Sequence, residues 1–134
     1  MAMVMGILII PIVALGATTQ SASAFSRLQT GTWTIHANGF DGDLKINSVA
    51  GGVVKGTVTF QGEQPQKIIG AYDQNLQKIW FVRIIKQNDP TANQYYTGYL
   101  FKESSFGSSG TADVMTGYFE HTNGIRYYGW YATR

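Results

Sequence analysis

The chain has 134 residues, which is the length of one domain, and its ten basic and eight acidic residues leave a formal net charge of +2. Because these charges are scattered singly, there is neither a basic stripe for a phosphate backbone nor an acidic tail, and we expect no nucleic-acid partner. Cysteine is absent, so disulfides cannot stabilise the domain.

The first predicted element is an apolar leader. Residues 3–17 form an almost unbroken apolar run, and Ala22-Ser23-Ala24 follows as a small-x-small pattern that signal peptidases accept. A run of 15 residues is shorter than the roughly 20 that a transmembrane helix needs. The usual basic residues at the start of a signal peptide are missing. We predict a signal peptide over 1–24 and an exported domain over 25–134, with retention of 1–24 as a membrane anchor as the alternative.

From Gly31 onward, short apolar and aromatic segments alternate with turns rich in Gly, Asn, Asp and Pro. No segment has a sustained helical period. The predicted strands are 31–37, 43–49, 52–60, 67–73, 78–86, 94–103, 112–121 and 125–133. Even spacing and hairpin-length connections predict an all-β, eight-stranded antiparallel up-and-down barrel, whose closure removes the edge strands.

Several predicted strands carry a glycine near the middle, beside an aromatic or apolar residue. These glycines are Gly56, Gly70, Gly98, Gly117 and Gly129. Glycine weakens a flat strand, so its recurrence suggests that it relieves the bending of a tightly curled barrel.

Alternation divides the later strands into two faces. One predicted face contains Trp80, Val82, Ile84, Tyr96, Gly98, Leu100, Met115, Gly117, Phe119, Tyr127, Gly129 and Tyr131. The other contains Ile79, Phe81, Arg83, Ile85, Tyr95, Thr97, Tyr99, Phe101, Tyr128, Trp130 and Ala132. Neither face is polar, so we expect the exterior to be covered by further copies of the chain in a homo-oligomer.

Three short patterns carry a family resemblance. They are Gly31-Thr32-Trp33, the segment Ile69-Gly70-Ala71-Tyr72-Asp73, and Tyr96-Thr97-Gly98. Their order and spacing resemble the avidin/streptavidin family of eight-stranded barrels, and the Gly-x-Trp opening is shared with lipocalins and other calycins. The resemblance implies that Trp33 packs across the closed end of the barrel, under Arg126 or Arg134.

The residues that bind biotin in that family are mostly replaced here. The family's first-strand Asn corresponds to Ile35, and its third-strand Tyr and Ser correspond to Val58 and Phe60. Two binding tryptophans correspond to Ile84 and Tyr96, and the segment 126–134 lacks the carboxylate of the last strand. The resemblance therefore implies a barrel that does not bind biotin, because most of the polar partners are missing.

Residue clusters that could support catalysis or metal binding are weak. His36 and His121 lack the spacing of metal ligands, and Asp41 with Asp43 is typical of a polar hairpin. Nucleophilic catalysis needs a nucleophile, a base and an orienting group, and the serine pairs Ser104-Ser105 and Ser108-Ser109 lie in a glycine-rich turn. We expect no enzyme, no metal and no cofactor.

The remaining prediction is a secreted binding module that holds a small hydrophobic or planar ligand near the open end of its barrel. The large aromatic residues expected to line the cup or its mouth are Trp33, Tyr72, Trp80, Tyr96, Phe119 and Trp130. Two alternatives remain open. One is a structural barrel with a filled interior and an apolar assembly surface. The other is an accessory subunit of a membrane complex that keeps residues 1–24 as an anchor.

Overall fold

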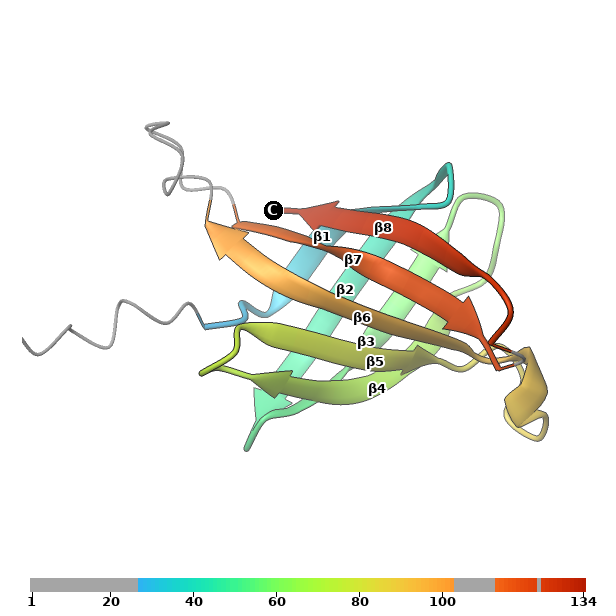
Figure 1. The fold of residues 1–134 in the computed structure, drawn as a ribbon, viewed down its shortest axis with the longest axis horizontal. Coiled ribbons are helices and arrows are strands. Elements are labelled where there is room, and N and C mark those ends of the chain that lie inside the picture. Colours follow the sequence, from blue (N-terminus) through green and yellow to red (C-terminus); the bar gives the residue numbers. More distant parts are fainter. Residues whose placement is uncertain (1–26, 103–112, 123) are drawn as a thin grey trace, which may run out of the picture.

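The computed structural model describes residues 27–102, 113–122 and 124–134. Eight antiparallel strands pair in chain order, and the last pairs with the first to close a barrel (Figure 1). They are β1 (Gly31–Ala37), β2 (Phe40–Ala50), β3 (Val53–Phe60), β4 (Gln66–Asp73), β5 (Lys78–Arg83), β6 (Gln94–Lys102), β7 (Asp113–His121) and β8 (Tyr127–Thr133). The predicted fold class is confirmed. The predicted signal peptide, residues 1–24, lies outside the described residues.

The two largest differences from the predicted strand boundaries, the start of β2 and the end of β5, have local reasons. β2 begins earlier, because Asn38 and Gly39 have φ of 49° and 83°, as a type I′ hairpin turn requires. β5 ends at Arg83, since the amide of Ile84 donates to the carbonyl of Lys67 and that of Ile85 to Asn93 Oδ1. The connection to β6 then contains a single 3-10 turn, η2 (Pro90–Ala92). Among the described residues, no helix is long and apolar enough to cross a membrane.

The two ends of the barrel are built differently. We call the mouth the end that carries the connections β1–β2, β3–β4, β5–β6 and β7–β8, seen at the right of Figure 1. We call the base the opposite end, where residues 27–30 enter β1 and where the chain ends after β8. The base is closed by the chain itself: Trp33 is fully buried, its indole Nε1 donates to the Gln29 carbonyl at 3.1 Å, and Leu28 is buried beside it in the same core.

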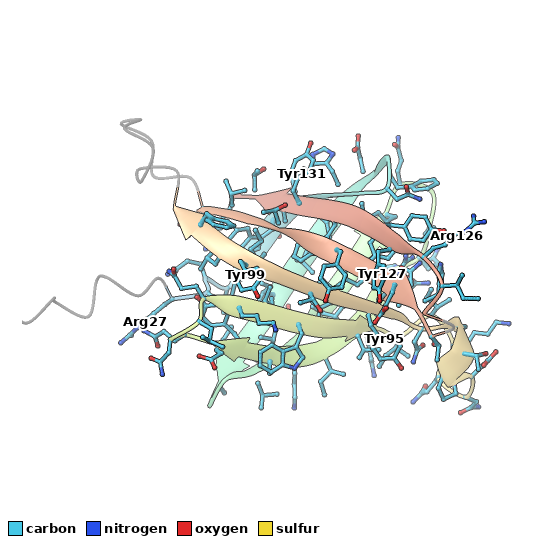
Figure 2. All side chains as sticks on the ribbon, viewed as in Figure 1. Arg27, Tyr95, Tyr99, Arg126, Tyr127 and Tyr131 are labelled. Carbon is cyan, nitrogen blue, oxygen red and sulfur yellow. The ribbon has the colours of Figure 1, made fainter. Side chains whose placement is uncertain are left out.

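The resemblance implied an arginine of the last strand at the closed end. Arg134 lies at the base, where its guanidinium is beside Gly31, the first residue of β1. Arg126 precedes β8 in the connection at the mouth, on the other side of the molecule from Arg27 (Figure 2). Of the two candidates, only Arg134 is therefore at the end that Trp33 closes.

The strand register determines which side chains share the interior. Phe81 pairs with Tyr96, and Phe119 pairs with Tyr128, so these four side chains lie on one side of the sheet. The predicted grouping of faces is therefore wrong for β5 and β8. Phe81 and Trp130 are buried, whereas Trp80 and Tyr127 face outward and are 43% and 65% exposed. Alternation along one strand cannot align its faces with those of its neighbour, because a shift of one residue exchanges them.

Two glycines make room for Trp130 in the lower core. Gly98 pairs with Gly117, and Gly117 pairs with Trp130, so the indole lies over a part of the sheet without side chains. A Cβ at Gly98 would lie 2.6 Å from the indole Cζ2, and one at Gly117 would lie 1.9 Å from the Thr97 carbonyl oxygen. The indole Nε1 donates to the carbonyls of Thr97 and Tyr118 at 3.1 Å each. Gly98 and Gly117 therefore allow β6 to pack closely against β7 and Trp130. Gly129 has no such role, because a Cβ there would meet nothing within 4 Å.

Candidate functional site

A continuous row of stacked aromatic rings crosses the interior of β5 to β8. Phe81, Tyr96, Phe119 and Tyr128 are successive register partners. Their ring centroids are 4.7 Å apart from Phe81 to Tyr96, 4.7 Å from Tyr96 to Phe119 and 5.3 Å from Phe119 to Tyr128, all in stacked geometry. Trp130 supports this aromatic row from the base side, edge-on to Phe81 at 5.7 Å and to Tyr96 at 5.8 Å. Stacked and edge-on pairs hold the rings in defined positions.

A polar row lies directly above the aromatic row, toward the mouth. Arg83, Gln94 and His121 are again successive register partners, each two residues along its strand from an aromatic ring below. Because side chains two residues apart share a face of a strand, these three point into the barrel. Arg83 and Gln94 are buried. The interior therefore changes from apolar to polar between the aromatic row and the polar row, which lies two residues farther along each strand toward the mouth.

Each of the three guanidinium nitrogens of Arg83 has a side-chain partner. Its Nη2 forms an ion pair with Glu63, its Nε donates to Gln66, and its Nη1 donates to Gln94 Oε1 at 2.9 Å. The guanidinium carbon also lies 4.6 Å from the centre of the Phe60 ring, in a cation–π contact. A buried charge needs such partners. Since Glu63 balances it, Arg83 contributes fixed hydrogen-bond donors to the mouth without a free positive charge.

The amide of Gln94 has one orientation that satisfies its neighbours. Its Oε1 accepts from Arg83 Nη1 and, at 3.0 Å, from the hydroxyl of Tyr96. The amide nitrogen must then point the other way, toward His121 Nε2 at 3.5 Å. Because an amide nitrogen can only donate, this contact requires His121 Nε2 to be the acceptor. The polar row thus has a defined pattern of donors and acceptors.

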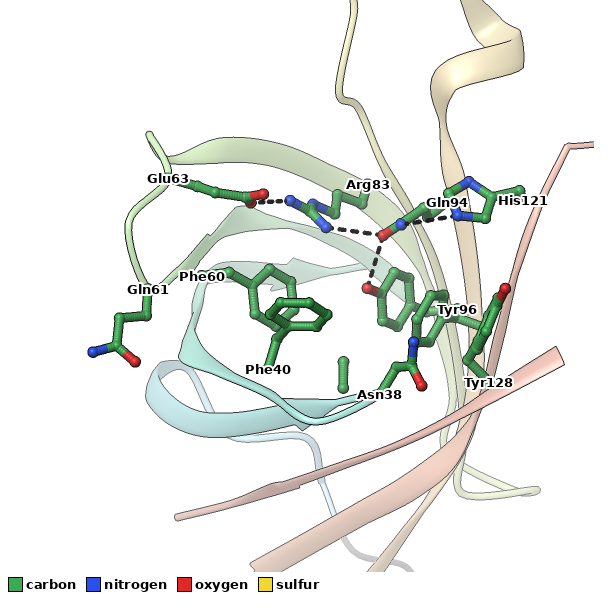
Figure 3. A pocket seen from close by; sticks show the side chains of 12 residues that line it. Asn38, Phe40, Phe60, Gln61, Glu63, Arg83, Gln94, Tyr96, His121 and Tyr128 are labelled. Atoms are coloured by element: carbon green, nitrogen blue, oxygen red, sulfur yellow. Dashed lines mark hydrogen bonds and ion pairs between the residues drawn. The ribbon is translucent and has the colours of Figure 1, made fainter.

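A cavity of about 280 Å³ opens at the mouth over these two rows (Figure 3). Its lining combines the polar row with aromatic rings and with two amide side chains at the rim, those of Asn38 and Gln61. The residues around it are Ala37, Asn38, Phe40, Phe60, Gln61, Glu63, Arg83, Gln94, Tyr96, Phe119, His121 and Tyr128. An apolar floor with a few placed polar groups is the usual composition of a small-molecule site.

The structure separates the six aromatic residues predicted to form a site. Tyr96 and Phe119 line the mouth cavity. Trp33, Tyr72 and Trp130 are buried in the core below it, and Tyr72 also lines a separate pocket with Leu28 and Val49. Trp80 points outward from β5, so the prediction that it lines the barrel or its mouth is wrong.

The polar residues of the mouth were missed as site residues by the sequence analysis. One signal in the sequence could have identified them. Each of Arg83, Gln94 and His121 lies two positions along its strand from an inward aromatic residue and therefore on the same face. Only the register shows that the three fall in one row.

The two histidines lie in different environments. His36 stacks on Tyr131 outside the barrel with ring centroids 4.5 Å apart, and its Nδ1 is bonded to the Asp41 carboxylate. His121 lines the mouth cavity from the end of β7. Within residues 27–102, 113–122 and 124–134, no cluster of three potential ligands could hold a metal ion. The serine-rich segment 104–110 lies outside the described residues.

Burial raises the pKa of Tyr96 from its ordinary value of 10.0 to about 12, against a smaller opposing effect of Arg83. Between these values the folded chain keeps a proton that the unfolded chain has lost, so raising the pH favours unfolding. We expect Tyr96 to contribute roughly 2–3 kcal/mol of stability that is fully present below pH 10 and lost as the pH rises to about 12. Urea denaturation at a series of alkaline pH values measures this loss. The Tyr96→Phe variant should show a shallower decline, and an identical decline would contradict the assignment.

Comparisons with protein-family models, with curated proteins and with solved structures found no match for this chain. The resemblance to avidin and streptavidin therefore stays a prediction from three short sequence patterns.

Proposed function

We propose that the protein is an exported, non-catalytic binding module whose mouth cavity holds a small, planar, uncharged ligand. One observation carries this proposal: the inward polar row Arg83–Gln94–His121, in which Arg83 and Gln94 are buried, lies directly on the stacked aromatic row and faces the same cavity. A filled structural core has no need of three inward polar side chains, since burying them requires compensating hydrogen bonds.

The charge balance favours an uncharged ligand. Arg83 is paired with Glu63, so an anionic ligand would have to compete with a carboxylate that is already in place. The other groups that line the cavity and can form hydrogen bonds include the amides of Asn38 and Gln61 at the rim and the ring of His121. Such groups can bind carbonyl, hydroxyl or ring-nitrogen atoms at the edge of a ligand.

The shape of the cavity favours a small planar ligand. At about 280 Å³ the cavity is just below the usual range of roughly 300–1,000 Å³ for small-molecule sites. Below the cavity the interior is occupied by buried side chains, including Trp33, Leu44 and Ile79, so a long ligand has no space to enter. The Phe60 ring and the aromatic row offer flat faces for stacking.

Native mass spectrometry of the protein purified from its own source tests this proposal. A complex that releases a small molecule on denaturation supports ligand binding and identifies the ligand by its mass. A protein that releases nothing, and that shows no bound mass after incubation with small neutral aromatic amides, contradicts it. The same spectra test export, because cleavage after Ala24 leaves Phe25 as the first residue.

The Gln94→Met variant tests the polar row itself. Methionine is close in size but cannot bridge Arg83, Tyr96 and His121. We therefore expect the dissociation constant of the ligand to rise by roughly tenfold or more. Gln87→Met is the matched control, because Gln87 is exposed in the connection between β5 and β6. Circular dichroism checks that both variants remain folded. Equal ligand retention in the two variants would show that the row does not contribute to binding.

A second candidate function is assembly through the outside of the barrel. It is favoured by the exposed aromatic residues of β5 to β8, which include Trp80, Tyr99 and Tyr118. The two candidates are compatible, since the mouth cavity and this surface lie on different parts of the molecule.

A further inference from the structure

The outward side of β5 to β8 carries an aromatic face whose exposure to water is unfavourable. We define this face by the outward side chains Trp80, Tyr95, Tyr99, Phe101, Tyr118, Tyr127 and Tyr131. Apart from the partly buried Tyr95, these residues are between 43% and 65% exposed. Figure 2 shows Tyr95, Tyr99 and Tyr127 gathered over these strands on the viewed side. Contiguous apolar patches on soluble proteins mark interaction sites, whereas single exposed rings do not.

The register makes the aromatic face continuous. Trp80 pairs with Thr97, which pairs with Tyr118, so the two rings flank one small side chain. Tyr118 in turn meets Tyr127 edge-on, with ring centroids 5.4 Å apart. An open groove of about 370 Å³ lies beside Trp80 and Tyr95. Outward side chains that line it are Lys78, Trp80, Val82, Tyr95, Thr97 and Glu120.

The face has one positive and one negative side chain, placed on opposite sides of its centre. Among the described outward positions of β5 to β8, only Lys78 and Glu120 are charged. Lys78 pairs with Tyr99, on the base side of Thr97, and its Nζ lies 5.9 Å from the Tyr99 ring centre. Glu120 pairs with Tyr95, on the mouth side of Thr97. A two-fold axis that lies in the plane of the face, passes near Thr97 and is perpendicular to the line from Lys78 to Glu120 therefore brings each charge of one copy opposite the unlike charge of the other.

We propose that the aromatic face binds a second copy of the chain in a two-fold dimer. In this dimer Lys78 of each copy lies against Glu120 of the other, on both sides of the axis. Trp80 of each copy then enters the partner's groove beside Tyr95 and Thr97. A two-fold interface must be complementary to itself, and this arrangement pairs both charges while covering the exposed rings.

The size of the face is consistent with a small stable interface. Four strands about 4.8 Å apart, each with roughly seven residues at about 3.3 Å, give a footprint of roughly 440 Å². The side chains that stand above the sheet increase the accessible area further. The lower limit for specific interfaces is roughly 600 Å² per partner, so nearly all of the face must be used. A partner that leaves Trp80 or Tyr118 exposed would not meet this limit.

Charge exchange across the interface tests the proposal. The full chain from its own source is measured by light scattering over a range of concentrations, together with the variants Lys78→Glu, Glu120→Lys and the double exchange. We expect a dimeric wild type and roughly tenfold or greater weakening in each single variant, because like charges then face each other twice. The double variant should return to near the wild-type dissociation constant.

A matched control is Lys55→Glu, since Lys55 is exposed on β3, outside the aromatic face. It should leave the dissociation constant unchanged, which separates pairing across the interface from an effect of net charge. A wild type that stays monomeric at the highest concentration overturns the proposal. A double variant that associates as weakly as the single variants overturns it as well, because the charges then do not meet across the axis.

Discussion

Replacing Trp33 with alanine should lower the free energy of unfolding by about 3–5 kcal/mol, as expected for the loss of a large buried aromatic side chain. Trp33 has no exposed surface, and its Nε1 donates to the Gln29 carbonyl. Its removal leaves a cavity at the base and frees the segment that carries Leu28, which is buried in the same core. Urea denaturation followed by circular dichroism measures the change without relying on tryptophan fluorescence.

The neighbouring Thr32 provides the control for this prediction. Thr32 faces outward on the same strand, so Thr32→Ala should change the free energy of unfolding by less than about 0.5 kcal/mol. If Trp33→Ala does not fold, Trp33→Phe keeps most of the ring and loses the hydrogen bond, and it should cost about 1–2 kcal/mol. A Trp33→Ala protein with an unchanged midpoint would show that this residue does not close the base, and the resemblance to calycins would lose its main support.

Replacing Gly117 with alanine is the second large effect that we expect, at about 3 kcal/mol or more. The added Cβ would lie 1.9 Å from the carbonyl oxygen of Thr97 and 2.5 Å from the Cα of Gly98. Both contacts are with backbone atoms of β6, so no side-chain rotation can relieve them. The two strands must separate, and that movement disturbs the Nε1 bond from Trp130 to the Thr97 carbonyl.

Gly129 makes a strict comparison, because it lies at the centre of the adjacent strand β8 and pairs with Tyr118. A Cβ there meets nothing within 4 Å. Gly129→Ala should therefore be neutral, or more stable by about 0.4–1 kcal/mol, through reduced freedom of the unfolded chain. Thermal unfolding of both variants decides the matter. Equal melting temperatures would contradict the close approach of β6 and β7.

The sequence predicted the strands well, because their signals are local. Alternating apolar residues and turn residues such as Asn38-Gly39 act within a few positions, and the strand order follows from short connections. The predicted extension of β5 to residue 86 is wrong for a reason that composition does not reveal. Ile84 and Ile85 look like strand residues, but their amides bond outside the β5–β6 ladder, to Lys67 and Asn93.

The candidate site was only partly predictable, because it depends on the register between neighbouring strands, which the composition of each strand does not determine. Tyr96 and Phe119 were expected to line the mouth, but Trp80 was placed on the wrong side of β5. Arg83, Gln94 and His121 are single polar residues near strand ends, and such residues are usually solvated. Their common row appears only when three strands are aligned side by side.

The pairing of β1 with β8 has a consequence for the way the chain folds. Among the described strands, seven pairings join consecutive strands, whereas this one joins the two ends of the domain through only four residue pairs, from Thr34 to Ala37. Hairpins between consecutive strands can form locally and quickly, but closing the ring costs the entropy of ordering the whole chain. The strand that completes the ring also carries Trp130, whose indole supports the aromatic row. We therefore expect ring closure and the final packing of the core to occur together during folding.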